Sequence, residues 1–208
     1  MSGPQFFDRI TIPAPFRNIY RRLGYKKGVT HLEAGQRNEL DAWIRDAGLL
    51  MHVKGVARRL PVIGRGSSKT LLTEDVVFES RDLAAFLAGC SEIALIAATA
   101  GGDIIGEIQK ATAGDQLTRG VVFDAVASET VDAALDWITA YLRQVLRREN
   151  KEPRRGRFSA GYGDFMLQNQ KRIFELLELY RLGVRINPSY VLIPEKTVTA
   201  VVGIRSKP

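Results

Sequence analysis

The stretch EIALIAATAGGDIIGEIQKATA, residues 92–113, is the most informative part of the chain about its fold. Its first nine residues form a continuous apolar run of strand length, which is typical of a strand buried on both faces. A glycine pair, 101–102, leads into an amphipathic helix that we expect Asp103 to cap. The pair lacks the G-x-G-x-x-G spacing of a dinucleotide-binding loop. We therefore interpret it as a tight strand-to-helix connection, with anion binding at the helix N-terminus as the alternative.

The segments on the N-terminal side of this stretch predict further helices and strands. The expected elements are helices at 16–23, stopped by Gly24, and at 32–50, extended stretches at 55–63 and 69–78, and a short helix capped by Ser80 and ended by Gly89. Between the extended stretches, GRGSS (64–68) predicts a turn. The longer GRGSSKT is not a phosphate-binding loop, because Ser68 precedes Lys69 and a strand follows instead of a helix.

The C-terminal side begins with the longest predicted helix, about residues 117–148, which must end before Pro153. Its apolar stripe consists of Val131, Leu135, Ile138, Leu142 and Val145. A later helix, with one face formed by Ile173, Leu176, Leu177 and Tyr180, is expected to stop at Gly183. The final SYVLIPEKTVTAVVGI contains two alternating apolar runs joined by residues 194–196, which predicts a hairpin. This mixture, without strict alternation, predicts an α+β fold around a partly antiparallel sheet.

Composition excludes several classes of protein. The 208 residues include 30 Lys and Arg against 23 Asp and Glu, for a net charge of +7. No apolar run approaches the roughly 18 residues of a membrane span, and the N-terminus lacks a secretory signal pattern. One cysteine, Cys90, and two histidines exclude an internal disulfide and a dense Cys/His metal cluster. We therefore expect a cytoplasmic protein; a carboxylate Mg²⁺ or Ca²⁺ site stays open, although no spacing argues for one.

The best candidate site is the loop RFSAGYGDF, residues 157–165, which leads into the last helix. Arg157 offers a planar fork of donors that fits a carboxylate. Gly161 and Gly163 leave room for a flat ligand to approach the backbone, and Tyr162 offers an aromatic face. The alternative is a helix lead-in whose glycines only turn the chain.

Two charged patterns stay undecided on the residues alone. Asp124, Ser128, Asp132 and Asp136 are four residues apart and share one helix face, which is either solvated or turned toward a ligand ammonium or hydroxyl group. The basic run at residues 143–157 is either a solvated helix end or a nucleic-acid surface, although it lacks interleaved aromatic residues. No Ser/His/Asp or Cys/His catalytic set can be assembled, because both histidines lie in the N-terminal quarter.

Several segments together resemble the activation, or S-adenosylmethionine-binding, domain of cobalamin-dependent methionine synthase, in particular its short free-standing relatives. They are RFSAGYGDF with QKRIFELL, LGVRINPSYVLIPEKTVTAVVGI, and the earlier CSEIALIAATAGGDIIGEI and VFDAVASETVDAALDWI. The resemblance extends from about Leu83 to Ile204. It implies a curved single α+β domain with a twisted, largely antiparallel sheet flanked by helices. We expect residues 1–30 to form a small irregular and helical segment packed on this main domain, residues 31–208.

The resemblance also implies a ligand, S-adenosylmethionine, and its site. Arg157 matches the arginine that holds the methionine carboxylate, and Ser159 and Gly161 match positions whose backbone meets the adenosyl part. Tyr162 matches the loop tyrosine, and Asp132 falls where the family has a glutamate near the polar groups of the ligand. A general acid or base is not required, because the reactivity resides in S-adenosylmethionine and in cobalamin.

The implied function is that of a reactivation subunit, a non-autonomous component of a methyltransferase. It presents S-adenosylmethionine to cob(II)alamin on a separate methionine synthase or corrinoid protein, with a flavodoxin or ferredoxin as electron donor and with no nucleic acid or membrane partner. The cobalamin is expected on the partner, since this chain lacks the Asp-x-His-x-x-Gly segment that ligates cobalt. The alternative is a corrinoid-protein chaperone or an S-adenosylmethionine sensor. It is favoured by Phe158 and Ala160 in place of loop prolines, Gln168 in place of a histidine, and the chain end at Pro208.

Overall fold

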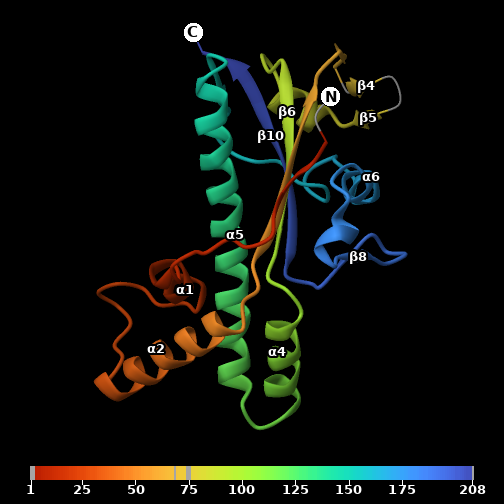
Figure 1. Cartoon of the computed structure of the whole chain (residues 1–208). Coiled ribbons are helices and arrows are strands. Elements are labelled where there is room, and N and C mark those ends of the chain that lie inside the picture. Colours follow the sequence, from red (N-terminus) through yellow and green to blue (C-terminus); the bar gives the residue numbers. More distant parts are fainter. Residues whose placement is uncertain (1–2, 68, 74–75, 208) are drawn as a thin grey trace.

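A curved antiparallel sheet and one long helix, α5, form the frame of the protein (Figure 1). The computed structural model describes residues 3–67, 69–73 and 76–207. In chain order the elements are β1 (Gln5–Phe7), α1 (Phe16–Arg22), α2 (Ala34–Leu49), β2 (Lys54–Pro61), β3 (Gly64–Arg65), β4 (Lys69–Thr73), β5 (Val76–Glu79), α3 (Arg81–Phe86), β6 (Glu92–Thr99), α4 (Asp103–Ala113), α5 (Leu117–Arg147), β7 (Lys151–Pro153), α6 (Asn169–Leu176), the 3₁₀ helix η1 (Leu179–Leu182), β8 (Arg185–Ile186), β9 (Leu192–Ile193) and β10 (Thr197–Ser206).

The main sheet has the strand order β1-β2-β6-β10-β7, and each neighbouring pair is antiparallel. The apolar run at 92–100 supplies β6, the central strand, between β2 and β10. Alternate residues of β6 enter two different cores: Ala94, Ile96 and Ala98 pack on the side of α5, whereas Ile93, Leu95 and Ala97 pack on the opposite side. The prediction of a strand buried on both faces is therefore confirmed.

α5 packs along one face of this sheet. The predicted apolar stripe supplies the buried residues Val131, Leu135, Ile138 and Leu142, whereas Val145 is only partly buried and Leu146 enters the core next to it. At Gly55 of β2 the sheet comes so close to α5 that an added Cβ would lie 2.7 Å from Ile138 Cδ1. A glycine is therefore required for this approach between helix and sheet.

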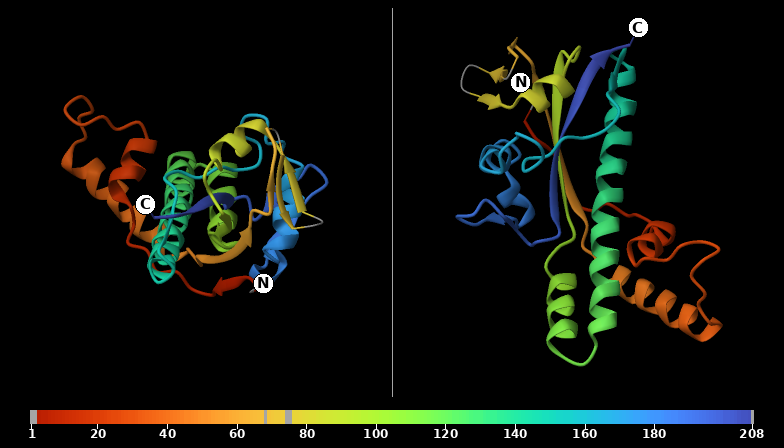
Figure 2. Two further views of the ribbon diagram at one scale, coloured as in Figure 1. Left: turned by 90° about the horizontal axis from the view of Figure 1, so that it is seen from above. Right: turned by 180° about the vertical axis from the view of Figure 1, so that it is seen from behind.

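The N-terminal segment contributes to the same core. β1 pairs with β2, and the side chains of Ile10 and Ile19 are buried in the cluster that includes α5. The helices predicted at 16–23 and 32–50 are confirmed as α1 and α2, which lie beside the N-terminal half of α5 (Figure 2). The division of the chain at residue 30 stays a prediction.

The other face of the sheet is covered by α3, α6, η1 and the small sheet β3-β4-β5 (Figure 2). The cap predicted for α3 is confirmed, because Ser80 Oγ accepts a hydrogen bond of 2.9 Å from the backbone N–H of Leu83. Phe78 and Phe165 meet edge to face, with ring centroids 5.3 Å apart. This core anchors the loop that follows Arg157.

The hairpin predicted at residues 189–204 is wrong. Its second run is β10, but its first run contains β9, which pairs with β8. β10 instead pairs with β6 from Thr197 to Ile204. Burial between the two cores explains the difference, because a long apolar strand removes more surface from water in the main sheet than against a two-residue strand.

Four smaller expectations also need correction. The extended stretch 69–78 forms two antiparallel strands, β4 and β5, and part of the turn predicted at 64–68 is strand β3, paired with β4; Ser68 lies outside the described residues. Asp103 does not cap α4, since Gly102 is the N-cap and the Asp103 carboxylate contacts His52 Nε2 at 3.1 Å. The last helix is interrupted at Glu178, where φ is 51°, so Tyr180 is 62% exposed.

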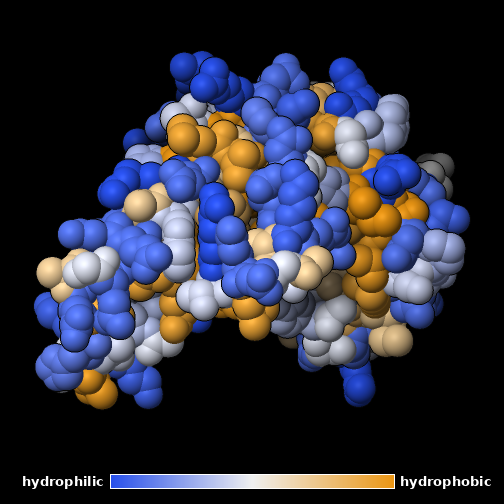
Figure 3. Space-filling view, turned by 90° about the horizontal axis from the view of Figure 1, so that it is seen from below, coloured by the Kyte–Doolittle hydropathy of each residue, from blue (hydrophilic) through white to orange (hydrophobic). Residues whose placement is uncertain are grey.

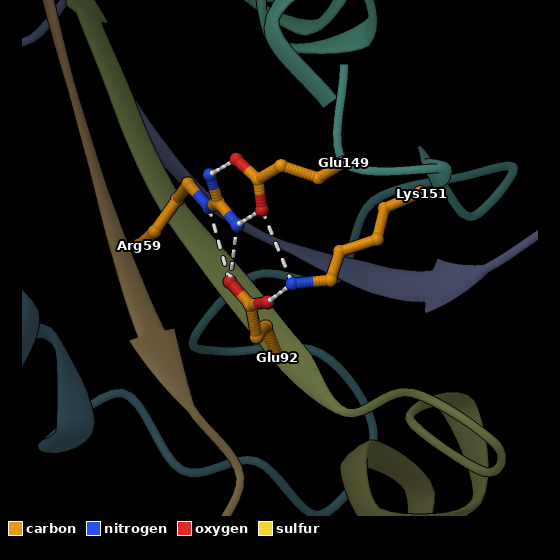
Figure 4. A network of polar contacts seen from close by, with 4 residues as sticks. All are labelled: Arg59, Glu92, Glu149 and Lys151. Atoms are coloured by element: carbon orange, nitrogen blue, oxygen red, sulfur yellow. Dashed lines mark hydrogen bonds and ion pairs between the residues drawn. The ribbon is translucent and has the colours of Figure 1, made fainter. Parts of the chain in front are cut away.

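Four charged side chains tie the end of α5 to the sheet (Figure 4). Arg59 of β2 contacts Glu92 at 2.7 Å and Glu149 at 2.6 Å, and Lys151 contacts the same two carboxylates. The hydrogen bonds from Arg59 and then Lys151 lower the pKa of Glu149 to about 2. This network fixes the chain where it leaves α5, since Glu149 and Lys151 lie eight and six residues before Arg157.

The predicted fold class is confirmed: the protein is a curved α+β domain with a twisted antiparallel sheet flanked by helices. Among the described residues, no helix combines the length and apolar character needed to cross a bilayer.

Candidate functional site

A cavity of about 620 Å³ lies along β10, where α5, the 157–162 loop, α6 and the 190–195 turn meet. β7 pairs with β10 only from Ile204 onward, and the loop takes over at Phe158, which bridges to Val201. The cavity therefore occupies the edge of the main sheet beside α5. Its polar lining includes Asp132, Arg157, Ser159, Tyr162, Gln170, Tyr190, Glu195, Thr197 and Thr199.

The predicted site residues come together here from two distant parts of the chain. Asp132 comes from α5, whereas Arg157, Ser159 and Tyr162 come from the loop. Gly161 belongs to the same loop, at a φ of +93° that disfavours other residues. Their roles in binding stay predictions, and their convergence on one cavity favours a ligand site over a loop that serves only to lead into a helix.

Hydrogen bonds to β10 hold the first half of the loop in place. The backbone N–H of Phe158 donates to the Val201 carbonyl at 3.0 Å, and Ser159 Oγ donates to the Thr199 carbonyl at 2.8 Å. The N–H of Gly161 donates to the Phe165 carbonyl at 2.7 Å, which closes the turn. The sheet thus preorganises the loop.

The second half of the loop is fastened to the N-terminus of α3. The Asp164 carboxylate accepts hydrogen bonds from Ser80 Oγ and from the N–H of Arg81, the latter at 2.8 Å. These bonds, led by that of Ser80, lower the pKa of Asp164. Gly163 has a φ of +53°, which disfavours residues other than glycine, and an added Cβ would lie 2.2 Å from a carboxylate oxygen of Asp82 and displace it. Tyr162 is therefore presented from a loop that is fixed at both ends.

Arg157 is the cation of the cavity. Its Nη1 contacts Asp136 Oδ1 at 2.6 Å, and 26% of its side chain is exposed, against 78% for Asp136. This pair occupies one of the five donors of the guanidinium and orients its plane. The remaining donors can receive a carboxylate from the cavity.

Asp132 lies one helical turn before Asp136 and also lines the cavity. The side chain is accessible to solvent, yet partial burial raises its pKa above the ordinary value, and Arg157 opposes that shift. A cationic ligand group near Asp132 would lower this pKa and favour the ionised carboxylate. Asp132 is therefore suited to receive an ammonium group.

The stripe on α5 that the sequence left undecided is turned toward the C-terminal segment. Lys196 Nζ contacts Asp124 at 2.7 Å and Ser128 Oγ at 3.0 Å, and Asp136 contacts Arg157. Asp132 is the member of the stripe for which no hydrogen bond or ion pair is found among the described residues. It is thus the member available to a ligand.

Sequence reasoning missed five polar residues of the cavity: Gln170, Tyr190, Glu195, Thr197 and Thr199. Gln170 is 6% exposed, and its Oε1 accepts a hydrogen bond of 3.0 Å from Thr199 Oγ1, while no described residue accepts from its amide nitrogen. Tyr190, at a φ of 64°, and Glu195 reach the cavity from the turn around β9. Two signals were present in the sequence: Gln170 lies at the start of the helix that follows the loop, and Tyr190 follows Ser189. The incorrect hairpin prediction placed residue 190 in a strand and gave no reason to place it beside the loop.

Exposed apolar residues surround the mouth of the cavity. Tyr162 is 69% exposed, Leu167 38% and Val191 43%, and all three also line the cavity. Figure 3 shows hydrophobic residues gathered on the side of the molecule that carries α6 and β8, at the right. A ligand bound here would lie next to an apolar surface.

The charges of the cavity define the ligand it suits. Arg157 fits a carboxylate, whereas Asp132 and Glu195 suit positive groups. Histidine and cysteine are missing from the cavity lining, and the described residues contain no cluster of three or more His, Cys, Asp and Glu side chains arranged for a metal ion. The arrangement is therefore equipped to hold and orient a zwitterionic or cationic ligand.

Comparisons with known proteins show the fold. The chain is similar to a solved structure described as "Crystal Structure of the MetH Reactivation Domain bound to AdoHcy", with a TM-score of 0.69 and 15% sequence identity, covering 97% of this chain and 78% of that chain. No protein-family model matches the chain, and the search of curated proteins gives no match. At this identity the likeness establishes the fold, and it confirms the fold that the sequence resemblance implied.

Proposed function

We propose that this protein binds S-adenosylmethionine in the cavity between α5 and the 157–162 loop, and supports the reductive methylation of cob(II)alamin on a separate corrinoid protein. The observation that carries the proposal is the convergence of Arg157, Asp132 and the loop on one cavity, at the edge of a fold whose solved neighbour is bound to AdoHcy.

The residues present fit such a ligand. The α-carboxylate of the methionine part would accept two hydrogen bonds from the Arg157 donors that Asp136 leaves available. Asp132 would accept from the α-ammonium, and the loop backbone with the buried Gln170 amide would contact the adenosyl part. The volume of about 620 Å³ is within the range of small-molecule sites.

Transfer of a methyl group requires little of the protein. S-adenosylmethionine supplies an activated methyl group on its sulfonium, so the chain needs to orient the ligand and to exclude water around it. Arg157 and Asp132 would fix the methionine end, and the exposed apolar rim at Tyr162, Leu167 and Val191 would be covered by the corrinoid partner. In this proposal the protein is a component of a methyltransferase that acts only with its partner.

The corrinoid partner is proposed to be a cobalamin-binding methionine synthase or a related corrinoid protein. An electron donor of the flavodoxin or ferredoxin type would supply the reducing equivalent, and the net charge of +7 favours acidic partners of this kind. The competing proposal, a corrinoid-protein chaperone or S-adenosylmethionine sensor, predicts binding without transfer.

The experiment uses S-adenosylmethionine labelled in its methyl group, a corrinoid protein in the cob(II)alamin state and a chemical reductant. We expect label to move to the corrinoid only when this protein is present, and Arg157→Ala to reduce the rate. Arg155→Ala is the matched control, since Arg155 is exposed and lies outside the cavity lining. Binding of S-adenosylmethionine without any transfer would support the chaperone or sensor instead.

A further inference from the structure

A second cavity, of about 790 Å³, lies at the N-terminal end of the molecule between α1, the 24–33 connection and α2. It is lined by four cationic side chains, Arg17, Arg21, Lys27 and Arg37, against one carboxylate, Asp41. The candidate site described above instead balances Arg157 with carboxylates. The second cavity is therefore suited to an anionic ligand, whereas the first is suited to a zwitterionic or cationic one.

The cations of this cavity are largely uncompensated. The side chains of Arg17, Arg21 and Lys27 make no hydrogen bond or ion pair with any residue that the structure describes. Arg17 and Arg21 are four residues apart on α1, where like charges repel and destabilise a helix. The adjacent Arg22, in contrast, is paired with Glu129 at 3.1 Å. A bound anion would relieve this repulsion.

The carboxylate of the cavity is already engaged. Tyr20 donates a hydrogen bond of 2.7 Å to Asp41 Oδ1. Burial and this hydrogen bond raise the pKa of Tyr20 to about 12, so the phenol stays neutral. Asp41 thus fixes the position of an aromatic ring and leaves the charge of the cavity positive.

Aromatic rings form a wall of the same cavity. Tyr20 and Tyr25 meet edge to face with centroids 5.6 Å apart, and the Arg37 guanidinium lies 6.0 Å above the Tyr25 ring. Phe16 also lines the cavity. Rings that are held by neighbours offer a stacking surface to a planar group.

We infer that this second cavity binds an anionic ligand that joins a planar ring to phosphate groups, the chemistry of a nucleotide. Arg17, Arg21 and Lys27 would contact the phosphates, and the planar ring would stack on the face of Tyr25, against which Tyr20 stands edge to face. The inference is independent of the function proposed for the first cavity.

The test is calorimetric titration of the full chain with ADP, GDP, pyrophosphate and adenosine at two salt concentrations. We expect ADP and GDP to bind with similar affinity, each more tightly than pyrophosphate or adenosine, and to weaken as salt rises. Arg21→Ala should weaken ADP binding by about tenfold or more, because a charge-assisted contact is lost. Tyr25→Leu should weaken the binding of ADP and leave the binding of pyrophosphate unchanged.

Two control variants separate this cavity from the rest of the protein. Arg143→Ala, at an exposed position on α5, and Arg157→Ala, in the first cavity, should leave ADP binding unchanged, and thermal melts should show that every variant is folded. Absence of ADP and GDP binding, or binding that Arg21→Ala does not alter, would overturn the inference. Binding of poly-glutamate without nucleotide binding would also overturn it, in favour of a docking surface for an acidic protein.

Discussion

Replacement of Arg157 by alanine is the perturbation whose outcome the geometry defines best. In the ligand-free protein Arg157 uses one nitrogen to contact Asp136, and that pair is exposed on the aspartate side, so its loss costs at most about 1 kcal/mol. A bidentate carboxylate contact is charge-assisted and is worth about 2–3 kcal/mol. We therefore expect Arg157→Ala to weaken S-adenosylmethionine binding by a factor of about 30–150.

Two companion variants sharpen this prediction. Arg157→Lys should restore little of the affinity, since an ammonium cannot reproduce the planar fork of donors. Arg155→Ala removes a charge from the same basic run without touching the cavity, so it controls for the change in net charge. Calorimetric titration measures all three affinities, and thermal melts report folding. An affinity of Arg157→Ala equal to that of the unmodified protein would end the assignment of this cavity.

Four further outcomes are expected. Asp132→Asn should weaken S-adenosylmethionine binding less than Arg157→Ala does in the same titration. Because the pKa of Asp132 is raised in the folded protein, the unmodified protein loses stability as pH rises through that pKa. Thermal melts of Asp132→Asn across this pH range should lack the loss. Glu149→Gln should reduce the loss of stability that the protein shows as pH falls. In the unmodified protein the Glu149 ion pairs stabilise the fold above the ordinary glutamate pKa, and this stabilisation is lost as pH falls toward about 2. Thermal melts across that pH range measure the difference. Gly163→Ala should destabilise by about 1–3 kcal/mol in denaturant titrations and weaken ligand binding, because φ is +53° and the space is filled, whereas Gly35→Ala in an open helical position should not destabilise. Limited proteolysis should release no stable fragment containing residues 6–25, since so short a segment cannot bury its own core.

Most elements of the fold could be predicted from local sequence patterns. The strand β6 and the helix α5 could be predicted because the pattern of apolar residues in each matches its surroundings. β6 lies between two cores and is apolar along its length, whereas α5 buries one face and has apolar residues every three or four positions. The pairing of β10 could not be predicted in this way. Its apolar alternation is satisfied equally by a local hairpin and by the distant β6, and only the whole core favours β6.

The candidate site shows the same division. Arg157 and Tyr162 stand in one loop whose residue types suggest a ligand, so local reasoning with a family resemblance found them. Gln170 is an ordinary polar residue at the start of a helix, and only its burial against Thr199 brings it to the cavity. The pairing of Arg157 with Asp136, likewise, depends on how the loop crosses α5 and has no signature in the sequence.

A crystal structure of the protein with S-adenosylhomocysteine bound would test the proposed binding site at atomic level. We predict that the ligand occupies the cavity between α5 and the 157–162 loop, with its carboxylate on the Arg157 guanidinium and its ammonium facing Asp132. Density for the ligand at another place, or in this cavity with the carboxylate turned away from Arg157, would contradict the proposed site.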